Sequence, residues 1–134
     1  MGGILRLCVG QSPAELSTTT ARLEWLKSVL SEAAFKQTDL LLLPELFATG
    51  YNIGDQIAAR AELADGPTAL TIATLAKAHN IAIHYGFAET DGNNTFNAAQ
   101  CFGPNGMRLG GHRKLAIPPG FEADHFKRGE GCSL

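Results

Sequence analysis

Residues 39–45 read DLLLLPE, and the architecture expected for the whole chain can be built outward from them. Four consecutive leucines closed by Pro44 predict a short strand over residues 39–43. An uninterrupted apolar run suits a strand that is covered on both faces, as in a sheet flanked by helices. Glu45 comes directly after this strand, at the edge of the sheet where α/β proteins bind ligands. The segment therefore predicts an α/β fold with a carboxylate at its binding edge.

A strand and a helix are expected on the N-terminal side of this segment. Residues 4–9 form a short apolar run, which we interpret as a buried strand. Ser17 or Thr18 is suited to be the N-cap of a helix that ends near Gln37. This helix is amphipathic, because apolar residues recur at helical spacing at Leu26, Val29, Leu30 and Ala33.

The sequence on the C-terminal side of residues 39–45 predicts one more helix and three strands. Residues 46–66 are mostly loop, with a short helical piece around residues 57–63. The second helix begins at Gly66-Pro67 and ends at His79-Asn80. Strands are expected over residues 81–88, 95–102 and 107–114, the last two joined by the turn 103–106, with loop from Pro118 onward. This order predicts an α/β layer architecture.

The length, composition and charge of the chain limit the classes of function that are open to it. The 134 residues fit one domain or part of a larger one, and a hydrophobic fraction of 45% suits a packed core. A net charge of -2 gives no bulk attraction to nucleic acid or to an anionic membrane surface. No stretch approaches the roughly 18 apolar residues that a membrane span needs. We expect a protein with no nucleic-acid and no membrane partner.

The cysteines and the N-terminus predict a cytoplasmic location. Cys8, Cys101 and Cys132 show no CxxC spacing, which argues against a disulfide framework or a zinc site. Free thiols indicate a reducing compartment. The N-terminus lacks the charged and apolar regions of a signal peptide.

Three residues are candidates for chemistry, each with a simpler reading. Glu45 could act as a base at the strand end, or it could be an ordinary loop carboxylate. Lys114 could stabilise a developing oxyanion, or it could belong to a solvated basic cluster with Arg113. Glu122 could orient that lysine, or it could lie on the surface. The four histidines show no metal-ligand spacing: His79, His84, His112 and His125.

Several blocks of the chain occur in a consistent order over its full length. They are residues 41–51 (LLLPELFATGY), residues 96–99 (FNAA), the turn 103–106 followed by 112–114 (HRK), Glu122 with Phe126 and Gly129 after it, and the N-terminal strand with Gln11. Together these blocks resemble the nitrilase superfamily, that is, the carbon–nitrogen hydrolases. Within it, residues 49–54 and 81–86 look most like aliphatic amidases that act on ω-amino amides.

The resemblance implies both a fold and a mechanism. Residues 1–134 would be a partial carbon–nitrogen hydrolase domain, the N-terminal half of a four-layer α-β-β-α sandwich. In the family a cysteine thiolate attacks a small-molecule amide and forms a thioester. The glutamate matching Glu45 is the general base, the lysine matching Lys114 stabilises the oxyanion, and the glutamate matching Glu122 orients the lysine or the substrate. No metal or organic cofactor is implied.

The chain departs from the family pattern at two points. The cysteine nucleophile is missing, since in the family it follows a further strand that we expect beyond Leu134. Cys132 lies too close to Lys114 and lacks the aromatic and aspartate neighbours of that nucleophile, and the other two cysteines are expected in the core. Ala116 occupies a position where the family often has histidine.

These departures leave more than one function open. Half of a two-sheet sandwich has an open edge and an uncovered apolar face, so we expect a marginally folded chain that hydrolyses no amide alone. It would form a homo-oligomer or associate with a longer homologue. One alternative is a non-catalytic interaction protein on the same scaffold. Another is a nucleotide-binding α/β domain, against which the missing Gly-rich phosphate loop counts.

Overall fold

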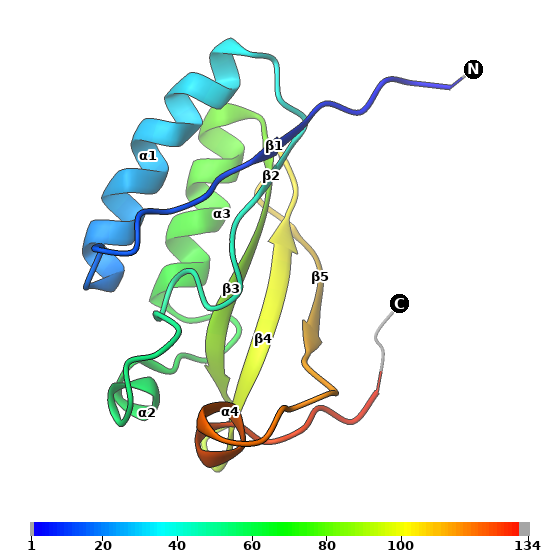
Figure 1. Ribbon diagram of the computed structural model, residues 1–134. Helices are drawn as coiled ribbons and strands as arrows, with labels where there is room; N and C mark the ends of the chain where they lie inside the picture. The colour runs from blue at the N-terminus through cyan, green and yellow to red at the C-terminus, as the bar shows by residue number, and fades with distance from the viewer. Residues whose placement is uncertain (1, 132–134) are drawn as a thin grey trace.

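The computed structural model describes residues 2–131, which form one five-stranded sheet with helices packed on it (Figure 1). The strands are β1 (Leu7–Val9), β2 (Leu40–Leu42), β3 (Ala82–Thr90), β4 (Thr95–Phe102) and β5 (Arg108–Arg113), in that order across the sheet. The helices are α1 (Thr19–Phe35), α2 (Gln56–Arg60), α3 (Pro67–His79) and α4 (Phe121–His125). Strands β1 to β3 are parallel, and β4 and β5 continue the sheet antiparallel.

Local capping sets the ends of the two long helices as predicted. The Thr18 side chain accepts a hydrogen bond from the Ala21 N–H at 3.1 Å, so Thr18 is the N-cap of α1. Pro67 occupies the first turn of α3, where its missing N–H costs no helical hydrogen bond. Asn80 ends α3 in the left-handed conformation, with φ of 53°.

The core lies between the sheet and the helix pair α1 and α3, which cover the same face (Figure 1). Register places Cys8, Leu41, Ile83 and Phe102 in one row across β1 to β4, and all four pack in this core. The opposite face carries the neighbouring row, which includes Val9, Leu42, His84 and Cys101. In the described part of the chain, no long helix covers this second face.

Two expectations about the first strands are therefore wrong. The leucine run is not covered on both faces, because Leu41 is fully buried whereas Leu40 and Leu42 are only half-buried. The first strand is shorter than residues 4–9 and is not buried: Leu7 is 55% exposed and Val9 is 68% exposed. The reason is that β1 is an edge strand, and alternate side chains point to the face without helices.

The expectation of loop from Pro118 onward is also wrong, because residues 121–125 form α4. The helix follows Gly120, which has φ of 89° and redirects the chain. A second, smaller apolar cluster holds it against the sheet: Leu46, Ile57, Ala88 and Phe126. A five-residue helix has too few internal hydrogen bonds to be stable alone, so this packing and not the local pattern creates it.

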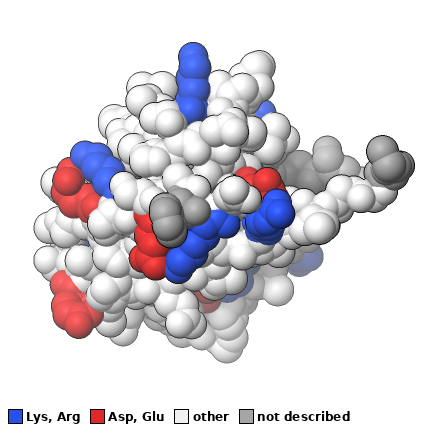
Figure 2. Space-filling view, turned by 90° about the horizontal axis from the view of Figure 1, so that it is seen from above, with Lys and Arg blue, Asp and Glu red and all other residues white. Residues whose placement is uncertain are grey.

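The surface of the described residues combines both signs of charge. Figure 2 shows cationic and anionic side chains next to one another on the face seen from above, and wide uncharged areas elsewhere on that face. None of the described helices is long and apolar enough to cross a membrane.

Candidate active site

Glu45 lies in the turn that follows β2, and hydrogen bonds to β3 hold this turn. The Gly86 N–H donates to the Pro44 carbonyl at 3.3 Å, and the Ala48 N–H donates to the Gly86 carbonyl at 3.0 Å. Leu46 takes a positive φ of 51°, which bends the chain sharply just after Glu45. The turn therefore projects the Glu45 carboxylate over the start of β4, at the carboxyl end of the parallel strands.

Glycine is required at position 86 because the turn passes directly over it. A Cβ there would collide with the Leu46 nitrogen and would lie 2.9 Å from the Glu45 Cα. The colliding atoms belong to the backbone, so a side chain at this position has to displace the residue that carries the carboxylate.

We expect Gly86→Ala to lower the free energy of unfolding by about 1–3 kcal/mol, as overpacking does. The matched control is Gly110→Ala in β5, because a Cβ there meets nothing within 4 Å. The control should stay within about 0.5 kcal/mol of the parent. Urea unfolding followed by circular dichroism measures both, and an equal loss in the two variants would contradict the steric argument.

Lys114 directly follows β5 and points toward Glu45. Its backbone N–H donates to the Asn97 carbonyl at 2.8 Å, which continues the pairing of β4 with β5. Its Nζ lies 2.8 Å from Oε1 of Glu45 and 2.8 Å from Oε2 of Glu122. The structure thus brings Glu45 and Glu122 together around the Lys114 ammonium group, although Glu45 lies 69 positions from Lys114 in the chain.

Glu122 enters the site from α4 and is 3% exposed, whereas Glu45 is 45% exposed. Besides Lys114, its carboxylate accepts a hydrogen bond from the Tyr51 hydroxyl at 2.8 Å. Tyr51 comes from the loop after the Glu45 turn, and its ring packs against Phe121. The two carboxylates therefore differ in environment, one enclosed and one open to the neighbouring cavity.

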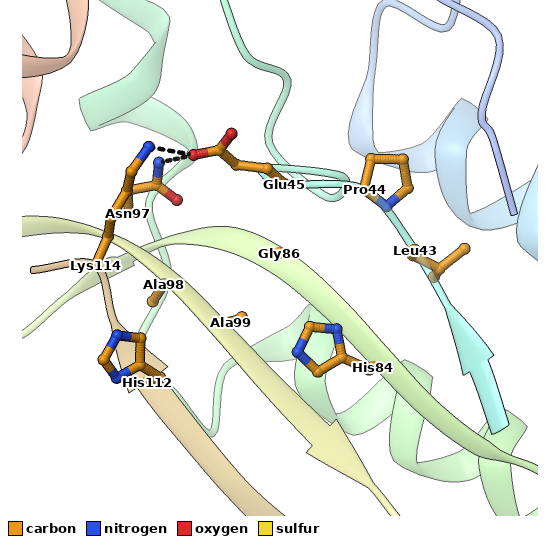
Figure 3. A pocket seen from close by; sticks show the side chains of 10 residues that line it. All are labelled: Leu43, Pro44, Glu45, His84, Gly86, Asn97, Ala98, Ala99, His112 and Lys114. Carbon is orange, nitrogen blue, oxygen red and sulfur yellow. Dashed lines mark hydrogen bonds and ion pairs between the residues drawn. The ribbon is translucent and has the colours of Figure 1, made fainter. Parts of the chain in front are cut away.

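Asn97 completes the cluster from the start of β4. Its Nδ2 donates to Oε1 of Glu45 at 2.6 Å (Figure 3). The same Nδ2 lies 3.4 Å from Oε2 of Glu122. Asn97 and Tyr51 were not among the predicted site residues. One signal could have pointed to Asn97: it is a polar residue of low strand propensity in an otherwise apolar strand segment, which suggests a buried partner.

The hydrogen bonds of the cluster favour its ionised form. Burial acts to raise the pKa of the Glu122 carboxyl, but hydrogen bonds from Lys114 and Tyr51 outweigh it, so that pKa lies below its ordinary value. Burial acts to lower the pKa of Lys114, but its bonds to Glu122 and Glu45 raise it overall. The hydrogen bond to Glu122 raises the pKa of the Tyr51 hydroxyl.

A cavity of about 240 Å³ adjoins this cluster on the sheet face that lacks long helices. Glu45, Asn97 and Lys114 line one end of it, and His84 and His112 line the other (Figure 3). Its remaining walls are apolar or small: Leu43, Pro44, Gly86, Ala98 and Ala99. Among the described residues, no group of histidine, cysteine and acidic side chains could hold a metal ion.

The described cysteines lie outside the cluster. Cys8 is in β1 and packs against the core, and Cys101 is in β4 beside His84 of β3. Neither residue lines the cavity. Cys132, which is not expected to be the nucleophile, lies outside the described residues.

Two comparisons of sequence find similar proteins. The family model described as carbon-nitrogen hydrolase matches residues 6–133. A Pseudomonas protegens protein named "Hydrolase in pqqF 5'region" is 38% identical over 129 residues, which cover 94% of this chain and 44% of that protein. Nitrilase 2 of Arabidopsis thaliana is 30% identical over 149 residues, covering 98% of this chain and 44% of that protein.

A comparison of structure agrees with the comparisons of sequence. The chain is similar to XC1258 from Xanthomonas campestris, described as a CN-hydrolase superfamily protein with an arsenic adduct in its active site. The identity is 26% and the TM-score 0.83, with coverage of 95% of this chain and 47% of that one. The chain spans less than half the length of these proteins. The expected α/β fold class and superfamily are confirmed.

Proposed function

The chain belongs to the carbon–nitrogen hydrolase family, and we propose that residues 1–134 supply the base and the oxyanion-stabilising cation of an amidase. Glu45 would be the general base, Lys114 the cation, and Glu122 the residue that orients Lys114. The substrate would be a small amide. The thiol would come from sequence beyond residue 134, because the relatives are more than twice as long as the matched part.

One observation carries this proposal: a single ammonium lies 2.8 Å from each of two carboxylates at the mouth of a cavity. Glu45 could take the proton of a thiol placed in that cavity and pass it to the departing ammonia. As the thiolate adds to the amide carbon, negative charge develops on the carbonyl oxygen, and Lys114 could stabilise it. Water activated by Glu45 would then hydrolyse the thioester to a carboxylic acid and free the thiol.

The test joins residues 1–134 to the remaining C-terminal part of the Pseudomonas protegens relative. We expect this chimera to release ammonia from small aliphatic amides, and residues 1–134 alone to release none above background. Aliphatic nitriles and ω-amino amides assayed in parallel would define the substrate class. Ammonia release by residues 1–134 alone that disappears in Glu45→Ala would overturn the proposed division of the site.

A second candidate function is association with a longer homologue or with copies of the same chain. The observation in its favour is the exposed apolar surface of the two edge strands and the residues next to them: Ile4, Leu5, Leu7, Val9, Met107 and Leu109. Exposed apolar side chains on an unpaired sheet edge are typical of surfaces that pair with another chain. Such an assembly would be cytoplasmic, as the free thiols suggest. Co-purification of tagged residues 1–134 with a full-length relative would support this function.

A further inference from the structure

Asn97 contacts all three predicted site residues, Glu45, Lys114 and Glu122. Its backbone carbonyl accepts the Lys114 N–H at 2.8 Å, and its side chain reaches Glu45 at 2.6 Å and Glu122 at 3.4 Å. The residue is 4% exposed and paired with Ala88 inside the sheet. The Glu45 turn and the segment that carries Lys114 and Glu122 therefore meet at one position in β4.

The chemistry of the cluster explains why an amide suits this position. Two ionised carboxylates and one ammonium carry a net negative charge, and the carboxylates repel each other. An ionised carboxylate only accepts hydrogen bonds, so the group between them has to donate. A second lysine or arginine would compete with Lys114 for both carboxylates, and an aspartate would add repulsion. The –NH₂ group of asparagine offers two protons without a charge.

This reasoning also fixes the orientation of the amide. Both neighbours of Nδ2 are carboxylate oxygens, and the amide oxygen could not donate to either of them. Only the orientation with the nitrogen toward Glu45 and Glu122 satisfies all three groups.

We propose that Asn97 is a positioning residue that holds the Glu45 and Glu122 carboxylates on the two sides of the Lys114 ammonium. In the free protein it directs Oε1 of Glu45 toward Lys114, so that the other carboxylate oxygen stays available to a thiol. The role in catalysis rests on the proposed function, whereas the positioning itself is a property of the folded chain and can be measured without substrate.

The other ionisable groups that face the cluster come from three further elements. Tyr51 donates to Glu122 from the loop after the Glu45 turn. His84 of β3 and His112 of β5 line the same cavity at its far end. Burial lowers the pKa of His84, so this side chain is neutral near pH 7 and adds no cation to the cavity. Asn97 is thus a donor to both carboxylates whose own charge does not depend on pH.

The first measurement uses the unmodified 134-residue chain. Nuclear magnetic resonance follows the Asn97 side-chain protons and the Glu45 and Glu122 carboxyl carbons while the pH is lowered. We expect the Nδ2 proton signals to shift together with the two carboxyl titrations, because protonation removes the acceptors. Asn97 side-chain signals that do not change through both titrations would overturn the proposal, and this result does not depend on any variant folding.

The second measurement compares Asn97→Asp with Asn105→Asp, which adds the same charge elsewhere. Asn105 lies in the turn at the other end of β4, and its Oδ1 accepts a backbone hydrogen bond that aspartate also accepts. We expect Asn97→Asp to move the Glu122 titration to higher pH and Asn105→Asp to leave it in place. Equal titrations in the two variants would overturn the proposal. Because no substrate is used, this failure differs from a chimera that hydrolyses no amide.

Discussion

Glu45→Gln in the chimera is expected to lower kcat/KM for amide hydrolysis by about 1,000-fold, within the range for loss of a general base. Glutamine has the same size, and its oxygen can still accept hydrogen bonds from Lys114 and Asn97. Its amide nitrogen cannot take a proton from a thiol. The loss should therefore lie in the chemistry, with substrate binding and folding nearly unchanged.

The control for this result is Glu15→Gln, which removes an exposed carboxylate that does not line the cavity shared by Glu45, Asn97 and Lys114. It should leave kcat/KM within about twofold of the parent, as surface substitutions usually do. The thermal midpoint of both variants should match that of the parent chimera. A Glu45→Gln enzyme that keeps a tenth or more of the parent kcat/KM would show that another group acts as the base.

Lys114→Met is expected to have the largest effect on stability, with a loss of about 2–3 kcal/mol in the free energy of unfolding. Methionine keeps the length of the side chain but leaves Glu122, which is 3% exposed, without its cation. Breaking a buried ion pair by removing one partner is strongly destabilising. We place the loss below the fully buried range because Lys114 is 31% exposed. In the chimera the same change should lower kcat about 100- to 1,000-fold.

A double variant separates the lost charge pairing from lost packing. Lys114→Met combined with Glu122→Gln leaves no buried charge without a partner, so we expect it to recover more than half of the lost stability. Lys27→Met is the matched control, since it breaks an exposed ion pair with Glu24 and should cost less than about 0.5 kcal/mol. If the double variant is no more stable than Lys114→Met, packing and not charge explains the loss.

The stability difference also depends on pH in a defined direction. The folded-state pKa of Glu122 lies below its ordinary value, so its contribution is complete above the unfolded pKa and is lost as the pH falls through the folded pKa. The difference between the parent and Lys114→Met should therefore be constant near neutral pH and shrink in acid. Urea unfolding at a series of pH values measures this change.

The local architecture was largely readable from the sequence. Thr18 as the cap of α1, Pro67 at the start of α3, and residues 95–102 as a strand follow from capping and alternation, which are properties of neighbouring residues. For the same reason, Glu45 could be placed just beyond β2. Such rules act over a few residues, so they need no knowledge of the rest of the fold.

The same local rules failed where burial depends on distant segments. Leu40 to Leu43 read as covered on both faces, yet the two long helices α1 and α3 lie on the same face of the sheet (Figure 1). Residues 121–125 showed no helical pattern, and α4 forms because Phe126 packs with Leu46 and Ile57. In both cases the deciding contacts join residues that are far apart in the chain, and periodicity carries no information about them.

Taken by itself, the sequence determined the kinds of elements, their order, and the positions of Glu45 and Lys114 at the ends of strands. Only the tertiary structure decided that these residues, 69 positions apart, share one hydrogen bond and that Glu122 joins them. It also added Asn97 and Tyr51. The physical reason is that a residue's neighbours in the chain determine its backbone conformation, whereas the packing of α4 and the Glu45 turn against the sheet determines which side chains meet.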